Sequence, residues 1–293
     1  MNIIKRLATF LQLIRVKQYT KNLLLFAPAF FGAKLFSISG FANLLLAFIS
    51  FSLVASTLYI INDLRDLKDD KKHPEKNSRP LASGKVKKTV AQRLLLLLLF
   101  LGLLAGLPLG VEFLAFLTSY IILMLAYSWK LKQFAVVDVF IIALGFVIRI
   151  LAGGVVSQVW VSHWLVITTF LLALFLALVK RKADLRLYTE SNTEKPLHFS
   201  GYNKSFLDIS IIISATVTVV TYLMYTFSPE IIEQFHSQYL YATGIFVLFG
   251  ILRYLQLAFV YRQDNNPSDV LLKDRLLQLT LILWVITFAV IIY

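Results

Sequence analysis

Long apolar runs separated by short polar loops cover most of the chain. Nine of them approach the roughly 20 residues that an α-helix needs to cross a bilayer. They are residues 20–36, 41–62, 91–109, 112–129, 134–153, 163–181, 206–226, 239–260 and 276–293. Pro28 and Gly32 interrupt the first run. The pattern predicts an all-α polytopic membrane protein, a bundle of nine transmembrane helices that forms a single domain over residues 1–293.

Lysine and arginine fall on alternate loops between these runs. The basic parts are the amino terminus and residues 63–93, 128–134, 180–204 and 261–275. The opposite loops contain Lys34 and otherwise Glu112, Glu230, Glu233 and histidines. Because basic loops stay in the cytosol, we expect a plasma-membrane protein with its amino terminus inside and its carboxyl terminus outside. Residues 1–19 lack a small-residue cleavage site and predict an amphipathic interfacial helix, not a signal peptide.

Composition narrows the chemistry. The chain is 58% hydrophobic, with a mean hydropathy of +0.75, and has no cysteine. Disulfides, cysteine metal sites and thiol catalysis are therefore excluded. The net charge of +13 lies in short loops between apolar runs, which favours membrane orientation and anionic substrates and predicts no nucleic-acid partner.

The most informative segment is residues 59–84. It places Asn62, Asp66 and Asp70 four residues apart at the end of an apolar helix. Four residues turn an α-helix by about 400°, so the three side chains share one face. Carboxylates at this spacing, next to substrate phosphates, are ligands that Mg²⁺ prefers. The segment predicts Asn62, Asp66 and Asp70 as metal-binding, catalytic residues at a cytosolic-side active-site mouth.

Basic residues follow directly, and the cluster supports more than one interpretation. Lys72, His73 and Arg79 are candidate substrate-binding groups for a phosphorylated molecule, although His73 is equally expected as a solvated residue. Asp63 and Asp69 lie off the shared face and are expected to be solvated, with Asp63 also a substrate-binding candidate. The alternative for the whole cluster is a solvated helix end, but membrane orientation alone needs no carboxylates.

A second cytosolic cluster covers residues 179–190, at the end of the sixth run. Lys180, Asp184 and Tyr188 repeat the four-residue spacing, and further cations surround them at Arg181, Lys182 and Arg186. Arginine suits bidentate phosphate contacts, so the cluster predicts a mostly cationic phosphate pocket with Asp184 as a candidate further metal ligand. The alternative is a set of cations at the membrane boundary with one acidic neighbour.

Several more polar residues complete the candidate set. Asp138 starts the fifth run and Arg149 lies eleven residues later, about three helical turns, on the same face. Charges inside a membrane run normally face a cavity or a partner, and whether Arg149 contacts substrate or a buried carboxylate stays open. The other substrate-binding candidates are Lys17 and Lys21 before the first run, beside Asn22, and Tyr127 and Lys130 in YSWKLKQ, where membrane orientation alone is an equal alternative.

The sequence resembles the UbiA-type membrane prenyltransferase superfamily. Its Asn62-xxx-Asp66-xxx-Asp70 motif, the nine runs and the second cluster fit that superfamily over nearly the whole chain. Three segments also resemble its phosphoribosyl-transferring branch: RVKQYTKNLLLFAPAFF, NDLRDLKDDKKHPEKNSRPLASG and YSWKLKQFAVVDVFIIALGFVIRILAGG. The resemblance implies a Mg²⁺-dependent transfer of 5-phosphoribose from 5-phosphoribosyl-1-diphosphate to a polyprenyl phosphate, with release of diphosphate, and leaves a homo-oligomer open.

One departure from the superfamily bears on the donor. Prenyl-transferring relatives usually carry a second aspartate-rich motif after the sixth run, where this chain has Asp184 and Tyr188 among cations. This difference favours a cationic pocket for a lipid phosphate or a ribose 5-phosphate. The alternatives are transfer of a prenyl group from a prenyl diphosphate to an aromatic or lipid acceptor, and a lipid or solute transporter, which predicts charges deep in several runs.

Overall fold

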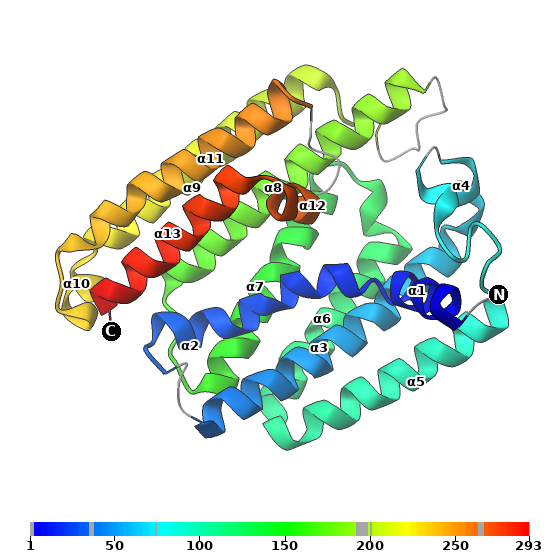
Figure 1. The fold of residues 1–293 in the computed structure, drawn as a ribbon, viewed down its shortest axis with the longest axis horizontal. Helices are drawn as coiled ribbons and strands as arrows, with labels where there is room; N and C mark the ends of the chain where they lie inside the picture. Colours follow the sequence, from blue (N-terminus) through cyan, green and yellow to red (C-terminus); the bar gives the residue numbers. More distant parts are fainter. Residues whose placement is uncertain are drawn as a thin grey trace. The chain divides into compact units, whose positions relative to one another are not determined.

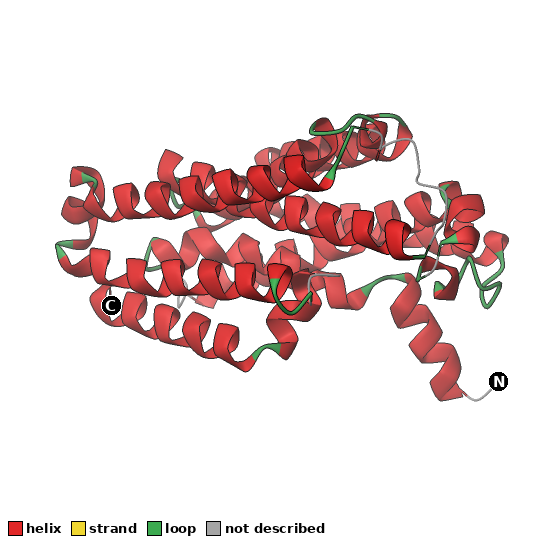
Figure 2. Ribbon diagram, turned by 90° about the horizontal axis from the view of Figure 1, so that it is seen from above, coloured by secondary structure: helices red, strands yellow, loops and turns green. Residues whose placement is uncertain are grey.

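The computed structural model describes residues 3–34, 38–73, 75–191, 199, 201–262 and 267–292. Over these residues the regular structure is helical and contains no strand (Figure 2). Within the described residues, eight helical spans are long and apolar enough to cross a membrane, and one of them, Tyr239–Phe259, includes the 3₁₀ helix η6 (Tyr239–Thr243) before its α-helix. They are α3 (Ile38–Arg65), α5 (Lys88–Gly106), α6 (Val111–Trp129), α7 (Val137–Ser157), α8 (His163–Glu190), α9 (Lys204–Phe227), α11 (Gly244–Phe259) and α13 (Arg275–Ile292) (Figure 1). The prediction of an all-α, multi-pass membrane protein is confirmed.

Each of the eight helices matches one predicted run, and the run at 20–36 is the exception. There the chain forms a 3₁₀ segment, η1 (Val16–Phe26), followed by the five-residue helix α2 (Ala27–Phe31). Pro28 lies in the first turn of α2 and Gly32 follows its last residue. Proline cannot donate a backbone hydrogen bond inside a helix, so a continuous α-helix is disfavoured here. Residues 35–37 of this run lie outside the described part.

Shorter helices connect the long ones. They are α1 (Ile3–Leu13), α4 (Leu67–Lys72), η2 (Lys76–Ser78), η3 (Leu107–Leu109), η4 (Leu131–Gln133), α10 (Pro229–Phe235), η6 (Tyr239–Thr243) and α12 (Pro267–Lys273). Within the predicted interfacial segment 1–19, α1 exposes Leu7, Phe10 and Leu11. Exposed apolar side chains on a short helix beside a membrane are typical of an interfacial position.

The chain divides into two compact units. Unit 1 is Met1–Lys132 with Ile148–Trp160, and unit 2 is Gln133–Val147 with Val161–Tyr293, so α7 contributes to both. The core of unit 1 includes the Phe51 ring packed against the Tyr120 ring at 5.3 Å between centroids. In unit 2, the Phe175 ring of α8 packs edge-on against the Tyr254 ring of α11.

In unit 1, η1 lies directly against the second half of α7. A Cβ built on Gly153 would lie 2.1 Å from the carbonyl oxygen of Leu25. Real Cβ atoms do not approach a backbone oxygen so closely, and packed interiors leave little room to relax. Only glycine therefore allows the backbones of η1 and α7 to lie at this separation.

We expect Gly153→Ala to lower the free energy of unfolding by about 1–3 kcal/mol, because the added methyl forces the two backbones apart. The measurement is the Tm of the purified protein in detergent. The matched control is Gly250→Ala in α11, where the nearest atom to the new Cβ is the Thr280 Cγ2 at 3.9 Å. There the higher helix propensity of alanine should add up to about 1 kcal/mol. Equal Tm values for the two variants would contradict the close approach.

Candidate active site

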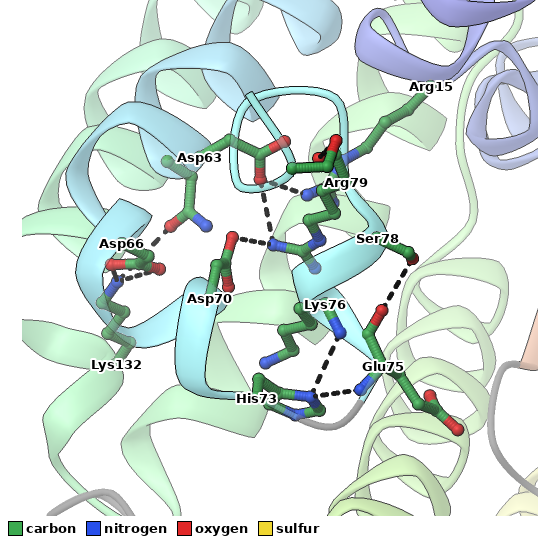
Figure 3. Close-up of polar contacts among 12 residues, drawn as sticks. Arg15, Asp63, Asp66, Asp70, His73, Glu75, Lys76, Ser78, Arg79 and Lys132 are labelled. Atoms are coloured by element: carbon green, nitrogen blue, oxygen red, sulfur yellow. Dashed lines mark hydrogen bonds and ion pairs between the residues drawn. The ribbon is translucent and has the colours of Figure 1, made fainter. Parts of the chain in front are cut away.

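The predicted metal ligands lie where α3 passes into α4 (Figure 3). Helix α3 ends at Arg65, and Asp66 forms a bend before α4 begins at Leu67. The helical hydrogen bonds continue through this bend: the Asp66 amide donates to the Asn62 carbonyl at 2.9 Å, and the Asp70 amide donates to the Asp66 carbonyl at 2.8 Å. The four-residue helical spacing predicted for Asn62, Asp66 and Asp70 is therefore kept.

Asp66 is bound by a lysine that the sequence analysis did not select. The Lys132 Nζ donates to both carboxylate oxygens of Asp66, at 2.6 Å to Oδ2, and lies 3.5 Å from the Asn62 Oδ1. Lys132 belongs to η4, two residues after the predicted Lys130, which is exposed. A basic loop with two lysines gave no local signal for choosing between them.

Arg79 binds two carboxylates at once (Figure 3). Its Nη1 donates to the Asp70 Oδ2 at 2.7 Å and to the Asp63 Oδ1 at 3.0 Å, and Arg15 also binds Asp63. Asp63 is only 3% exposed, so the expectation that it is solvated is wrong. Its carboxylate is buried because it pairs with the guanidinium groups of Arg15 and Arg79. Asp69 is exposed, as expected. A role for Asp63 in substrate binding stays a prediction.

The protonation of Asp70 depends on Arg79. Burial raises the pKa of the Asp70 carboxyl above its usual range, while the charge of Arg79 and its hydrogen bond act to lower the pKa. A buried carboxylate is kept ionised by an adjacent cation. Any further cation bound at Asp70 would act in the same direction as Arg79.

The remaining basic candidates of this segment differ in burial. His73 is buried, and its Nδ1 accepts hydrogen bonds from the backbone amides of Glu75 at 3.1 Å and Lys76 at 3.3 Å. The expectation of a solvated His73 is therefore wrong, because the ring closes the turn after α4 (Figure 3). Lys72 is exposed. Elsewhere in unit 1, Lys17 is exposed, and Lys21 and Tyr127 are half-buried.

Arg149 lies in a buried polar network of unit 1. Its Nε donates to the Asn22 Oδ1 at 2.7 Å and its Nη2 to the Tyr120 Oη at 2.8 Å. The Asn22 Nδ2 donates in turn to the Ser52 Oγ at 2.9 Å. Both of these Arg149 partners are neutral. The network joins η1, α3, α6 and α7, so Arg149 stabilises the interior of unit 1 whatever its contact with substrate.

The predicted second cluster, residues 179–190, lies in unit 2, and its Arg181 joins the buried Asp184 to the separately predicted Asp138 of α7. Asp138, with 0% exposure, accepts hydrogen bonds from the Arg181 Nε at 2.6 Å and from the Tyr202 hydroxyl. Asp184 lies 3.4 Å from the Arg181 Nη1 and 3.3 Å from the Lys180 Nζ. Tyr202 was not predicted, since nothing in its local sequence distinguishes it from other tyrosines.

Two further predicted residues of this cluster make contacts outside it. The Arg186 Nη2 donates to the backbone carbonyl of Arg262 at 3.1 Å. Tyr188 is buried, and its ring lies 5.2 Å from the Phe199 ring between centroids. Tyr188 therefore packs in the core of unit 2, and a phosphate-binding role for its hydroxyl stays a prediction.

The donor set around Asp66 fits Mg²⁺. In the described residues, no three His, Cys, Asp or Glu side chains come together as a metal cluster. The predicted set instead has two carboxylates and one amide oxygen, and Mg²⁺ usually takes one or two carboxylates together with substrate phosphates and water. The ammonium of Lys132 already contacts oxygens of both Asn62 and Asp66. These oxygens thus converge on a positive charge.

The multi-pass helices, the acidic motif and its basic partners agree with what known proteins show of a class of membrane-embedded transferases, the UbiA family. The model of the UbiA prenyltransferase family matches residues 23–276, and the chain belongs to that family. Among its relatives, the decaprenyl-phosphate phosphoribosyltransferase of Mycolicibacterium smegmatis is 32% identical over 96% of this chain and 91% of the relative. The enzyme of the same name from Corynebacterium glutamicum is 30% identical over 96% and 85%.

Solved structures show the same fold. A UbiA homologue from Archaeoglobus fulgidus bound to GPP and Mg²⁺ superposes with a TM-score of 0.69, covering 97% of this chain and 99% of that one, at 19% identity. The same homologue bound to DMAPP and Mg²⁺ gives a TM-score of 0.71, with the same coverage, at 18% identity. At these identities the likeness establishes the fold alone.

We expect Asp63→Asn to destabilise the protein, because it removes the negative charge that Arg15 and Arg79 share. These arginines keep 23% and 25% of their side chains exposed, so the cost should be about 1–3 kcal/mol, below that of breaking a fully buried pair. The measurement is Tm in detergent. Asp69→Asn, an exposed neighbour, is the matched control and should stay within about 0.5 kcal/mol of wild type. An equal loss in both variants would show that the buried charge is not responsible.

Proposed function

We propose that this protein transfers 5-phosphoribose from 5-phosphoribosyl-1-diphosphate to a polyprenyl phosphate and releases diphosphate. The observation that carries the proposal is the second cluster: Asp184 contacts Lys180 and Arg181, at the place where prenyl-transferring relatives usually carry a second aspartate-rich motif. The named relatives, similar over nearly the whole chain, are phosphoribosyltransferases of decaprenyl phosphate. Both observations favour a phosphoribosyl donor.

Asn62, Asp66 and Asp70 are the residues that would hold Mg²⁺ against the diphosphate. The ion supplies positive charge that neutralises the departing diphosphate. Lys132 and Arg79, already within hydrogen-bond distance of Asp66 and Asp70, supply donors for the diphosphate oxygens. In this proposal, hydrogen bonds from Asn62, Lys72 and Arg79 bind and orient the diphosphate or the ribose phosphate.

In the transfer step, the bond between the ribose anomeric carbon and diphosphate breaks, and an oxygen of the lipid phosphate bonds to that carbon. The lipid phosphate is already anionic, so no strong general base is required. The chain's contribution is to position the two substrates and to neutralise charge. Lys180, Arg181 and Arg186 bind a substrate phosphate, either that of the lipid or the ribose 5-phosphate, and the lipid chain stays in apolar surroundings.

The two units act as one domain in this proposal. The family model extends across both of them. We place the protein in the plasma membrane, and the alternating basic loops support a cytosolic amino terminus and an outer carboxyl terminus. Six further residues are retained as candidate substrate contacts: Lys17, Lys21, Asp63, His73, Tyr127 and Lys130.

Prenyl transfer is the second candidate function. The A. fulgidus homologue was solved with GPP or DMAPP and Mg²⁺, so this fold accommodates prenyl diphosphates. A transporter is disfavoured because the chain belongs to a family of transferases.

A donor-swap assay separates the two candidates. Purified protein in defined lipid, with decaprenyl phosphate and Mg²⁺, should release diphosphate from phosphoribosyl diphosphate, and chelation with EDTA should stop the release. Geranyl diphosphate, with the same acceptor or with an aromatic acceptor, should give no diphosphate above background. Release from geranyl diphosphate alone would reverse the assignment of the donor.

The metal-binding prediction is tested by Asp66→Asn and Asp70→Asn. Each removes a carboxylate from the diphosphate site, and we expect diphosphate release to fall at least about 100-fold, the scale of losing one preorganised electrostatic contact. The measurement is the initial rate against Mg²⁺ concentration, with Tm recorded for each variant. Asp69→Asn is the matched control and should keep the wild-type rate. Wild-type rates in both site variants would remove these residues from the mechanism.

A further inference from the structure

A strained residue lies at the start of α7 in unit 2. Val136 has a φ of 71°, in the left-handed region that β-branched residues rarely adopt. Its backbone N–H donates to the Tyr202 Oη at 2.7 Å. Such strain persists where the surroundings enforce it, and it concentrates at functional sites. Tyr202 is one of the groups that enforce it.

Tyr202 contacts the chain on both sides of the start of α7, at Val136 just before the helix and at Asp138 in its first turn. A Cβ on the preceding residue, Gly201, would lie 2.5 Å from the Ala135 Cβ, so the glycine permits the approach. The Tyr202 hydroxyl accepts from Val136 and donates to Asp138. Burial, and then the hydrogen bond to Asp138, raise the pKa of Tyr202. The hydroxyl therefore keeps the proton that it donates.

Asp138 transmits this contact to α8. One of its carboxylate oxygens accepts from Tyr202 and the other from the Arg181 Nε at 2.6 Å. The guanidinium of Arg181 is further placed by the Asp184 Oδ2 at 3.4 Å and by the Phe199 ring at 5.7 Å. The orientation of one arginine is thus set by groups from α7, from α8 and from the segment before α9.

Stability alone is a weak reason for such an arrangement. A buried ion pair is often no more stable than apolar residues of the same size. A guanidinium, however, recognises phosphate through donors in a fixed plane, so its orientation determines how well it binds. The fully buried Asp138 carboxylate accepts a hydrogen bond from the Arg181 Nε and so fixes the plane of the guanidinium.

We propose that Tyr202 and Asp138 are positioning residues that orient Arg181 to bind a phosphate group of a substrate. The inference rests on the proposed phosphoribosyl transfer for the identity of the two phosphate-bearing substrates. Tyr202 contacts neither substrate in this account; it acts through Asp138 and the strained Val136. The shared ligand chemistry is a phosphate monoester, present in both the lipid phosphate and the ribose 5-phosphate end of the donor.

The test measures binding before turnover, so that its failure is distinct from failure of the proposed reaction. Full-length wild type and Tyr202→Phe in detergent are titrated separately with farnesyl phosphate and with phosphoribosyl diphosphate and Mg²⁺, by calorimetry. We expect Tyr202→Phe to bind one of the two probes about fivefold more weakly, the scale for a residue acting through another. The probe that is weakened identifies the phosphate. In turnover, its KM should rise while kcat changes less than twofold.

The matched control is Tyr222→Phe, also in unit 2. Tyr222 is equally buried, and its hydroxyl bonds to the Thr243 Oγ1 at 2.7 Å and to the Trp284 Nε1 at 2.8 Å. It should show a comparable change in Tm with unchanged binding of both probes. Equal binding by Tyr202→Phe and Tyr222→Phe would overturn the inference and leave Tyr202 a structural residue. Absence of saturable binding of both probes to wild type would also overturn it.

A second variant covers the case in which Tyr202→Phe is too unstable to assay. Asp138→Asn keeps the shape of the side chain and removes the charge that grips Arg181, so it should weaken the same probe. Where both variants are soluble, the double variant should weaken binding by less than the product of the two single effects, because both act on one arginine. Fully multiplicative effects would contradict a shared action through Arg181. Intact probe binding without phosphoribosyl transfer by wild type would overturn the proposed function only.

Discussion

The structure depends on one electrostatic constraint: a carboxylate at a membrane boundary has to be held by a cation. An ionised group taken out of water without a partner is too costly to keep. Asp63, Asp66 and Asp70 meet this requirement with cations from elsewhere in unit 1, namely Arg15, Arg79 and Lys132. These ion pairs fix the chain before η1, the turn after α4 and the loop after α6 around the end of α3. The local fold and the candidate site are therefore products of the same charges.

Unit 2 also holds its buried carboxylates with a cation, but there one arginine binds both of them. Asp138 is fully buried and shares Arg181 with Asp184, and a tyrosine hydroxyl supplies the remaining hydrogen bond. Arg149, by contrast, is satisfied in unit 1 by an amide, a hydroxyl and an aromatic ring. A guanidinium spreads its charge over a plane and is less strongly hydrated than an ammonium, so arginine tolerates such neutral surroundings. The choice of arginine at position 149 follows from this property, whereas Arg181 lies between two carboxylates.

Hydropathy predicts the long helices well, because a run of about 20 apolar residues has few alternatives in a membrane. The acidic motif is also readable, since the spacing of Asn62, Asp66 and Asp70 is a local property of a helix. The run at 20–36 is apolar enough to be predicted as a transmembrane helix, but its first part forms a 3₁₀ segment in which Asn22 is buried. Hydropathy alone does not predict this difference. The contacts of Lys132 and Tyr202 could not be predicted from the sequence for a different reason. Each lies 60 or more residues from the carboxylate that it contacts, and no local pattern encodes such a pairing.

The carboxylates of the candidate site are already neutralised by basic side chains, and this pairing affects the proposed chemistry. In the resting protein Lys132 and Arg79 neutralise Asp66 and Asp70. In the proposed reaction, these carboxylates would hold Mg²⁺ against the diphosphate, and the same cations would then pair with diphosphate oxygens, because phosphates attract charge-assisted donors strongly. No further basic side chain would have to be brought in, and groups that are already in place are the most effective in electrostatic stabilisation. In the proposed function, the cations that stabilise the resting fold are thus the groups that would bind the substrate.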